Sequence, residues 1–254
     1  MAPRSSRGTD ELRALAIERN VAPFAEGSCS IATGQTRVLC TATVQESVPE
    51  WRRGAGAGWV TAEYAMLPRS TLRRTSRERG ALGGRTQEIQ RLIGRALRAA
   101  IDLEALGERT VLVDCDVLVA DGGTRTAAIT GAAVALHDAC DWLVRKGILT
   151  SSPMRELVAA TSVGIVDGEV RLDLDYLEDV RADVDLNLVA LESGGLVEVQ
   201  GTAEHGSFST DRLDQLVAVG LGGIRALNAA QRKALAQAQA RALAPNAART
   251  PPST

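Results

Sequence analysis

The sequence predicts an α/β (α+β) fold in which mixed sheets pack against helices. Two blocks of β-hairpin follow one another along the chain, and each block is followed by a long helical segment. The chain has 254 residues, enough for one large domain or for two lobes that share a core. We divide it into residues 1–150 and 151–244, followed by a disordered tail at 245–254 that is rich in proline and small residues.

The first block begins with a hairpin over residues 28–44, whose two short strands surround a Thr-Gly-Gln turn. A strand follows at 59–66, and Pro68 ends it. Residues 69–84 are highly charged and lack apolar periodicity, which is typical of an exposed arm that can be disordered without a ligand. Residues 85–103 repeat apolar side chains every three to four positions, which predicts an amphipathic helix with one basic face.

The next strand is expected over 110–119, and a glycine turn connects it to a helix over 124–146. The second block then follows. It comprises a hairpin of residues 157–166 and 169–174, a short turn or helix at 175–179, and strands at 181–191 and 196–201. In the first of these two strands the period-two pattern places three polar residues on one face: Asp183, Asp185 and Asn187. Residues 209–244 are expected to form two helices with a break near residues 220–223.

Composition excludes several kinds of site. His137 and His205 are the only histidines, so a site built from several histidines is excluded and proton transfer falls to carboxylates. The four cysteines form no C-x-x-C pair, which favours buried free thiols in a reducing cytoplasm over disulfides or zinc. The N-terminus does not have the pattern of a secretory signal, and no apolar run reaches the roughly 20 residues of a membrane helix.

Charge is distributed unevenly along the chain. Residues 51–100 contain eleven arginines and three glutamates, a balance of +8, whereas residues 161–204 contain eleven acids and two arginines, a balance of −9. A basic half and an acidic half suggest a track for a polyanion beside a metal-binding or proton-donating pocket. Complementary charge between subunits of an oligomer is the alternative, and the two interpretations are compatible.

The glycine turn is the first candidate site. Gly122 and Gly123 allow the backbone to approach a ligand closely, and the N–H groups at the start of the helix near Thr124 are unpaired. The guanidinium of Arg125 matches the geometry of phosphate oxygens. These features predict an anion-binding site. An ordinary strand–helix connection with a solvated arginine is the alternative, because short glycine turns are common.

Asp179 and Asp185 form the second candidate site. Two carboxylates beside a phosphate site need a divalent cation or an arginine to offset their charge. With a phosphodiester substrate, one carboxylate could hold Mg²⁺ and the other could protonate a leaving hydroxyl group. The alternative is a pair of solvent-facing acids at the edge of a strand.

The third candidate site is the arm, whose arginines lie beside a single acid, Glu78. Such a cluster suggests contact with single-stranded RNA, and an ordinary solvated charge run is the alternative. The arginines of the cluster are Arg69, Arg73, Arg74, Arg77 and Arg79.

Five segments of the chain resemble the bacterial ribonuclease PH family. They are GWVTAEYAMLPRST (58–71), GRTQEIQRLIGRALRA (84–99), DCDVLVADGGTRTAAITGA (114–132), LDLDYLEDVRADVDLNLV (172–189) and EVQGTAE (198–204). The resemblance implies the ribonuclease PH fold, which is related to the ribosomal S5 domain 2. Residues 1–150 would then form an S5-like lobe with the arm and the phosphate loop, and residues 151–244 a second lobe with the acidic site residues.

The resemblance also implies an activity, which is phosphorolytic 3′→5′ trimming of tRNA precursors in the cytoplasm. Inorganic phosphate is the co-substrate, Mg²⁺ the cofactor and a nucleoside diphosphate the product. The family assembles as a homohexamer, a ring-shaped trimer of dimers, and its partner is RNA rather than DNA or a membrane. Polynucleotide phosphorylase and the ring subunits of the exosome are relatives of the family.

Matching motif positions imply residue roles. Asp179 and Asp185 would hold Mg²⁺, and Asp185 is the better candidate for the proton donor. The residues expected to bind phosphate are Arg85, Gly123, Thr124 and Arg125. Those expected to contact tRNA are Arg69, Arg74 and Arg77.

Two departures from the family pattern are visible. The N-terminal segment RSSRGTDELRALAI lacks the usual proline-ended form, and the loop before Arg85 is short and irregular. A catalytically silent RNA-binding ring subunit is one alternative function, although the candidate phosphate and acid residues are intact. A small-molecule kinase on an S5-like fold is another, but the serine-rich glycine loop of those kinases is not seen in this sequence.

Overall fold

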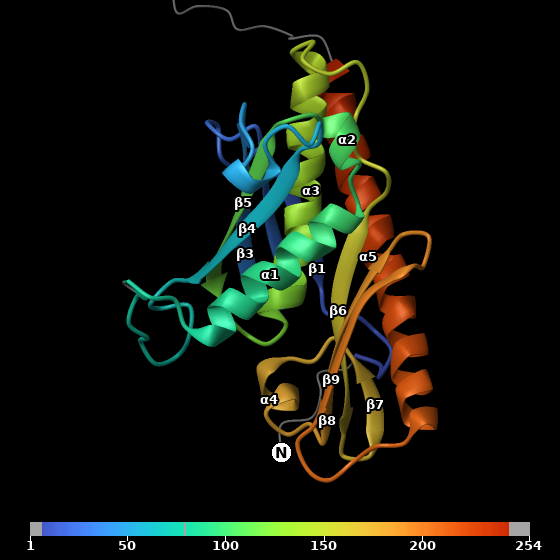
Figure 1. The fold of residues 1–254 in the computed structure, drawn as a ribbon. Coiled ribbons are helices and arrows are strands. Elements are labelled where there is room, and N and C mark those ends of the chain that lie inside the picture. Colours follow the sequence, from blue (N-terminus) through green and yellow to red (C-terminus); the bar gives the residue numbers. More distant parts are fainter. Residues whose placement is uncertain (1–6, 79, 244–254) are drawn as a thin grey trace, which may run out of the picture.

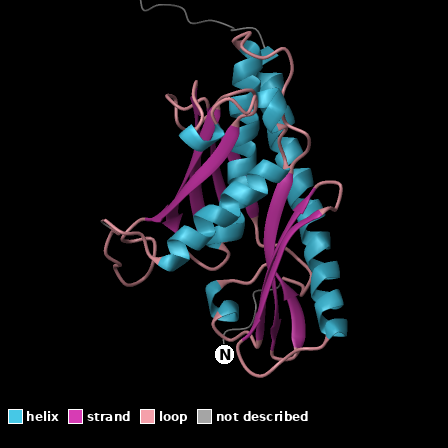
Figure 2. Ribbon diagram, in the orientation of Figure 1, coloured by secondary structure: helices cyan, strands magenta, loops and turns pink. Residues whose placement is uncertain are grey.

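The computed structural model describes residues 7–78 and 80–243. Two β-sheets lie on either side of a central helix, and two further long helices pack against them (Figures 1 and 2). The arginine at position 79 and the tail at 245–254 fall outside the described residues.

The first sheet has five strands in the order β1-β2-β3-β5-β4. β4 and β5 are parallel, because the helical crossover between them returns the chain in the same direction, and the other pairs are antiparallel. The strands are β1 (Leu15–Arg19), β2 (Gly27–Thr33), β3 (Thr36–Gln45), β4 (Trp59–Met66) and β5 (Thr110–Val119). The expected hairpin and the two later strands are confirmed, whereas β1, a five-residue edge strand, was not predicted.

The second sheet has four antiparallel strands in the order β7-β6-β8-β9. The strands are β6 (Val158–Val166), β7 (Glu169–Leu172), β8 (Val184–Leu191) and β9 (Leu196–Ala203). The expected hairpin and strands are confirmed, with one correction. β8 begins at Val184, so Asp183 precedes the strand and only Asp185 and Asn187 of the three polar residues lie on it.

The helices are η1 (Glu50–Arg52), α1 (Gly84–Ala99), α2 (Leu103–Leu106), α3 (Thr124–Arg145), α4 (Tyr176–Asp179) and α5 (Thr210–Leu243). α1 buries the apolar stripe expected from the sequence against the first sheet. The expected helix over 85–103 is too long, because α1 ends at Ala99. A new turn, α2, then starts at Leu103, and the side chain of its N-cap residue, Asp102, accepts hydrogen bonds from two N–H groups of that turn.

α3 is the central helix of the molecule. It contacts β2 and β3 on one side and β6 on the other, and small residues allow this close packing. Gly27 of β2 shows how close it is, since a Cβ there would lie 2.0 Å from the carbonyl oxygen of Ala135. By length and composition α3 could cross a membrane, contrary to expectation, but 78% of its most apolar window is buried inside the protein. Its apolar composition therefore reflects its place in the core.

α5 is one continuous helix, so the expected break near residues 220–223 is wrong. The glycines there serve packing instead. A Cβ at Gly220 would lie 2.7 Å from Leu188, and a Cβ at Gly223 would lie 2.8 Å from Leu172. Both partners belong to the second sheet, so the glycines let the helix approach that sheet closely.

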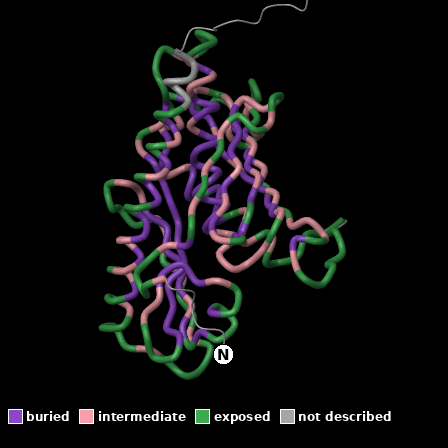
Figure 3. The backbone as a smooth tube through the Cα atoms, turned by 180° about the vertical axis from the view of Figure 1, so that it is seen from behind, coloured by how far each residue is buried: buried purple, intermediate pink, exposed green. Residues whose placement is uncertain are grey.

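Buried residues follow α3 and the strands, whereas the arm after β4 is largely exposed (Figure 3). The first sheet, α1, α2 and α3 fall within residues 15–145, and the second sheet, α4 and α5 within 158–243. The larger hydrophobic core contains α3 together with Val158, Ala160 and Val189 of the second sheet. Part of the second sheet therefore joins this core, while the rest of the sheet packs with α5 in a separate cluster. All four cysteines are buried and free, as expected.

Candidate active site

The glycine turn lies at the N-terminus of α3. Gly122 and Gly123 both adopt left-handed backbone conformations, with φ of +73° and +64°. Gly123 is the N-cap of α3 and supplies no side-chain hydrogen bond, so the first N–H groups of the helix are available to an anion. Thr36 supports the turn from β3, because its hydroxyl donates to the Gly122 carbonyl at 2.7 Å and accepts from the Asp121 N–H at 2.9 Å.

The first turn of α3 is held by residues from other elements. The Tyr64 hydroxyl lies 2.8 Å from the Thr124 hydroxyl, and burial raises the pKa of Tyr64. Arg125 donates from Nη1 to Gln200 Oε1 at 2.9 Å and lies 3.7 Å from Glu88. Since Gln200 belongs to β9, Arg125 connects the first turn of α3 to the second sheet.

Arg85 lies in the first turn of α1, where its side chain is exposed. It forms no hydrogen bond or ion pair with any described residue, so its guanidinium is available to a ligand. Its positive charge acts to lower the pKa of both Tyr64 and Asp179, as does that of Arg125. The two arginines therefore lie within electrostatic reach of the same carboxylate.

α4 and β8 bring the two aspartates together. A capping box of Asp175 and Glu178 forms α4, which ends at Asp179. The pKa of Asp185 is raised to about 6, first by burial and then by the negative charge of Asp179, while Arg125 opposes both effects. The pKa of Asp179 is also raised, by partial burial of its carboxylate. The two arginines, Arg85 and Arg125, and the two aspartates thus form one cluster of interacting charges.

The chemistry of these donors fits a magnesium ion bound together with substrate. In the described part of the chain, no group of three or more His, Cys, Asp or Glu residues could hold a metal ion. Mg²⁺ differs from most metals in this respect, because one or two carboxylates, water and substrate phosphates are enough to bind it. Asn187 donates to Asp185 Oδ2 at 3.3 Å, whereas the buried Asp185 Oδ1 has no hydrogen-bond partner among the described residues. This oxygen is free to accept a cation.

Models of two domains of the 3′ exoribonuclease family match the chain, domain 1 over residues 11–140 and domain 2 over residues 156–223. The chain belongs to this family. It is 54% identical to ribonuclease PH of Parasynechococcus marenigrum over 93% of this chain and 95% of that protein. It is 56% identical to ribonuclease PH of Methylorubrum populi over 91% of this chain and 99% of that protein. The expected ribonuclease PH family and its phosphorolytic 3′→5′ exoribonuclease activity are confirmed.

Solved structures confirm the fold. Rice Rrp46 covers 90% of this chain and 98% of its own, with a TM-score of 0.73 at 22% identity. A chain of the Archaeoglobus fulgidus exosome with RNA bound to the active site covers 87% of this chain and 89% of its own, with a TM-score of 0.74 at 24% identity. The expected α/β architecture with mixed sheets is that of these ribonuclease PH-fold proteins.

The arm extends from the end of β4 to the start of α1 and projects from the body of the exoribonuclease (Figure 1). Arg69, Arg74 and Arg77 are exposed along it. The base of the arm is fixed, because the Ala120 N–H donates to the Ser70 carbonyl at 2.8 Å, directly before the glycine turn. The arm therefore leaves the body beside the candidate phosphate site.

Part of the acidic half is neutralised within the chain, which the charge count alone does not reveal. Acids of this half pair with arginines in Asp173–Arg13, Glu178–Arg7, Asp167–Arg181, Glu192–Arg232 and Glu198–Arg95. Asp179 and Asp185 form no such ion pair with the described residues. Their charge is left for a ligand.

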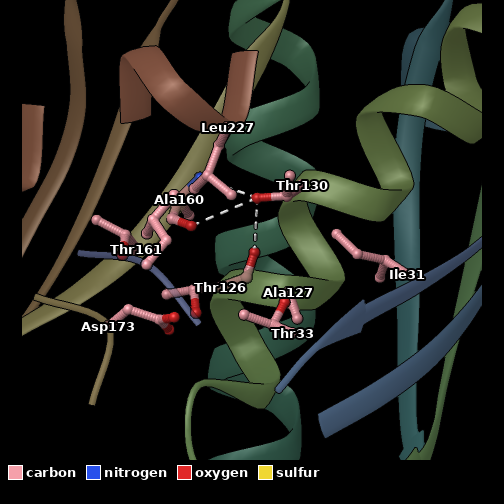
Figure 4. A pocket seen from close by; sticks show the side chains of 10 residues that line it. Ile31, Thr33, Thr126, Ala127, Thr130, Ala160, Thr161, Asp173 and Leu227 are labelled. Atoms are coloured by element: carbon pink, nitrogen blue, oxygen red, sulfur yellow. Dashed lines mark hydrogen bonds between the residues drawn. The ribbon is translucent and has the colours of Figure 1, made fainter. Parts of the chain in front are cut away.

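A small cavity of about 10 Å³ lies behind the first turns of α3 (Figure 4). Thr126, Thr130, Thr161 and Asp173 contribute polar side chains to its lining. This volume is about the space of a single water molecule, too small for a nucleotide. The candidate active site is instead the open surface between the glycine turn and the two aspartates.

Two residues of this site, Tyr64 and Gln200, were not predicted from the sequence. Gln200 lies 75 positions from Arg125, and spacing along the chain carries no signal for a contact between two sheets. The resemblance offers one clue, because Gln200 lies inside the segment EVQGTAE.

Proposed function

We propose that this exoribonuclease shortens the 3′ ends of tRNA precursors by transferring terminal nucleotides to inorganic phosphate. The observation that supports this most is the placement of Arg125. Its charge acts on both Asp179 and Asp185, while it lies in the first turn of a helix whose N-cap leaves N–H groups unpaired. An anion site and two carboxylates therefore share one surface.

Inorganic phosphate binds at the start of α3 and is held by the N–H groups after Gly123, by Thr124, and by the guanidinium groups of Arg85 and Arg125. This arrangement holds the phosphate dianion beside the anionic RNA backbone, so that the two repelling groups can react. A phosphate oxygen attacks the phosphorus of the last phosphodiester. The bond from that phosphorus to the 3′ oxygen breaks, and the terminal nucleotide leaves as a nucleoside diphosphate.

The departing 3′ oxygen takes a proton as its bond breaks. Asp185 is the donor in this proposal, because a pKa of about 6 leaves part of the carboxyl groups protonated near neutral pH. Asp179 and Asp185 would hold Mg²⁺, which offsets negative charge on the phosphate oxygens when it is bound. Asn187 keeps the Asp185 carboxylate oriented through its hydrogen bond.

Arg69, Arg74 and Arg77 contact the tRNA body, because the exposed arm presents three cations beside the active site. A homohexamer, a trimer of dimers, is the proposed assembly, since the arm of one subunit is too small to enclose a tRNA. The proposed location is the cytoplasm, where four buried free thiols remain reduced.

A phosphorolysis assay tests this function. Purified protein is incubated with a short RNA, Mg²⁺ and inorganic phosphate, and the products are separated. Phosphate-dependent release of nucleoside diphosphates supports the proposal. Binding of RNA without such release would instead support the silent ring subunit. Release of nucleoside monophosphates without phosphate would indicate hydrolysis.

A further inference from the structure

Arg13 lies buried behind the candidate phosphate site, with 8% of its surface exposed. Its guanidinium group donates hydrogen bonds to two residues, Asp173 and Asp121. Nε and Nη2 donate to the two carboxylate oxygens of Asp173 at 3.1 and 2.7 Å, while Nη1 donates to the carbonyl of Asp121 at 2.5 Å. A planar guanidinium can make these three bonds at once, which a lysine cannot do.

The two partners of Arg13 belong to the two halves of the site. Asp121 directly precedes Gly122 and Gly123, which form the phosphate turn. Asp173 directly precedes the segment that leads into α4 and Asp179. The side chain of Arg13 therefore spans from the phosphate turn to the chain segment that carries a candidate metal ligand.

Asp173 has an unusual backbone conformation that this contact supports. It is 3% exposed and has a φ of +53°, which is rare for a residue other than glycine. Such a conformation persists only where surrounding bonds hold it, and it often marks a functional region. The guanidinium group of Arg13 makes two of these bonds, and the Arg13 N–H makes another at 2.8 Å. The Asp173 N–H donates to the Ser162 carbonyl at 2.7 Å, and Arg7 donates to the Asp173 carbonyl at 3.0 Å.

Gly123 of the turn leaves room for the guanidinium group of Arg13. A Cβ at Gly123 would lie 2.9 Å from Arg13 Nη2, so the absence of a side chain lets the guanidinium group lie directly under the turn. Figure 4 shows Asp173 across the small cavity from Thr126 in the first turns of α3. Arg13 and Asp173 therefore support the phosphate site from behind without forming its surface.

We propose that Arg13 is a positioning residue of the phosphorolytic site, which sets the distance between the phosphate turn and the α4 segment through its shared bonds to Asp121 and Asp173. It touches no substrate. The inference rests on the proposed function, because it concerns the alignment of bound phosphate with the metal-binding carboxylates.

The chain contains a matched control. Arg19 is half-buried, with 10% of its side chain exposed, and also pairs through its guanidinium group with an aspartate, Asp138, while it donates to the Leu235 carbonyl at 2.7 Å. Asp138 lies roughly 21 Å along α3 from Thr124, at 1.5 Å per residue. Loss of Arg19 therefore removes a comparable buried ion pair far from the phosphate turn.

The experiment compares Arg13→Met, Arg13→Lys and Arg19→Met with the unaltered protein. For each protein we would measure the melting temperature, the dissociation constant for tRNA, and kcat and KM for phosphate. Measurements are made at least about 15 °C below the lowest melting temperature of the set, so that every protein is folded in the assay. Release of nucleoside diphosphates by the unaltered protein checks the proposed function itself, so its failure is distinguishable from failure of this inference.

We expect Arg13→Met to lower kcat/KM for phosphate by about 100-fold, because misplacement by about 1 Å has an effect of that order. The dissociation constant for tRNA should change less than about twofold, as the arm is untouched. Arg19→Met should lower the melting temperature but keep kcat/KM within about twofold of the unaltered protein.

Arg13→Lys keeps the charge but loses the three-way contact, so it should recover more of the melting temperature than of kcat/KM. The inference is wrong if Arg13→Met and Arg19→Met reduce kcat/KM equally, or if Arg13→Lys turns over phosphate normally. If Arg13→Met does not fold, Arg13→Lys against Arg19→Met makes the same comparison.

Discussion

Gly122 packs directly against the backbone of Asp175. A Cβ at Gly122 would lie 2.7 Å from the Asp175 carbonyl carbon, 2.7 Å from the Leu174 carbonyl oxygen and 2.8 Å from the Tyr176 nitrogen. The glycine turn before α3, the candidate phosphate site, therefore touches the chain that enters α4. Only a residue without a side chain permits this contact, which fixes the two halves of the active site against each other.

Replacing Gly122 with alanine should abolish most phosphorolysis. The methyl group would push the turn away from α4, because the atoms it meets are backbone atoms that cannot rotate aside. It would also occupy a left-handed conformation at φ +73°, which costs about 1–2 kcal/mol. The measurement is kcat/KM for phosphate together with the melting temperature.

Gly147→Ala is the matched control for this variant. Gly147 has a similar φ of +70°, but nothing lies within 4 Å of the position of its Cβ. Both variants should lose about 1–2 kcal/mol of unfolding free energy from the backbone conformation alone. Only Gly122→Ala should lose activity. Equal activity in the two variants would show that the contact with Asp175 does not align the site.

Replacing Arg125 with alanine should raise KM for phosphate by about 10- to 100-fold, the effect of losing one or two charge-assisted hydrogen bonds. Binding of tRNA should stay nearly unchanged, because the exposed arm lies on a different element. Arg125→Lys should restore little, since an ammonium group cannot bind phosphate and Gln200 with the same planar geometry. Phosphate titration and a tRNA-binding assay separate these effects, and a parallel loss of both would contradict the division of roles.

Replacing the arm arginines together should weaken tRNA binding and flatten its dependence on salt. Each cation that contacts a phosphate contributes about 1 to the slope of log K against log salt, so the slope should fall by about 2–3. KM for phosphate on a short RNA should not change. The variant carries glutamine at Arg69, Arg74 and Arg77. The control removes three exposed arginines from α3 and α5: Arg145, Arg212 and Arg225. An equal loss of tRNA binding in the control would indicate a general charge effect.

Local signals in the sequence predicted most of the strands and helices. The period-two patterns of β4 and β5 and the stripe of α1 each report burial on one face, which neighbouring residues determine. The prediction of a break in α5 was wrong, because contacts with residues distant in the sequence keep this helix continuous. Gly220 and Gly223 weaken a helix in isolation, but their contacts with the second sheet hold it straight. A local pattern does not contain that tertiary contact.

The site was predictable in part for the same reason. Arg125 and the glycine turn are adjacent in sequence, so the anion cradle was visible as a motif. The support from Arg13 was not, because Asp173 lies 160 positions away. Ion pairs with arginines elsewhere in the fold neutralise part of the acidic half, so the net charge of the segment overstated its free negative charge.

Replacing Asp185 with asparagine should stabilise the folded protein at high pH while abolishing phosphorolysis. Burial raises the pKa of Asp185 from 3.8 to about 6, so the folded state binds its proton more tightly than the unfolded state does. The free energy of unfolding therefore falls as pH rises through that interval, and above it the ionised carboxylate destabilises the fold. Two pKa units correspond to at most about 3 kcal/mol, and partial solvent access reduces this to about 1–2 kcal/mol.

Denaturant unfolding at pH 8 and pH 4, without divalent cations, measures this effect. Asp185→Asn should be more stable than the unaltered protein at pH 8, and the difference should shrink towards zero near pH 4, where the carboxyl group is protonated in the folded state. Asp183→Asn is the control, because Asp183 is exposed and precedes β8. Adding Mg²⁺ at pH 8 should raise the melting temperature of the unaltered protein more than that of Asp185→Asn, since a bound cation relieves the repulsion between Asp185 and Asp179. If Asp185→Asn is less stable than the unaltered protein by the same amount at both pH values, burial does not raise the pKa of the Asp185 carboxyl group in the folded state.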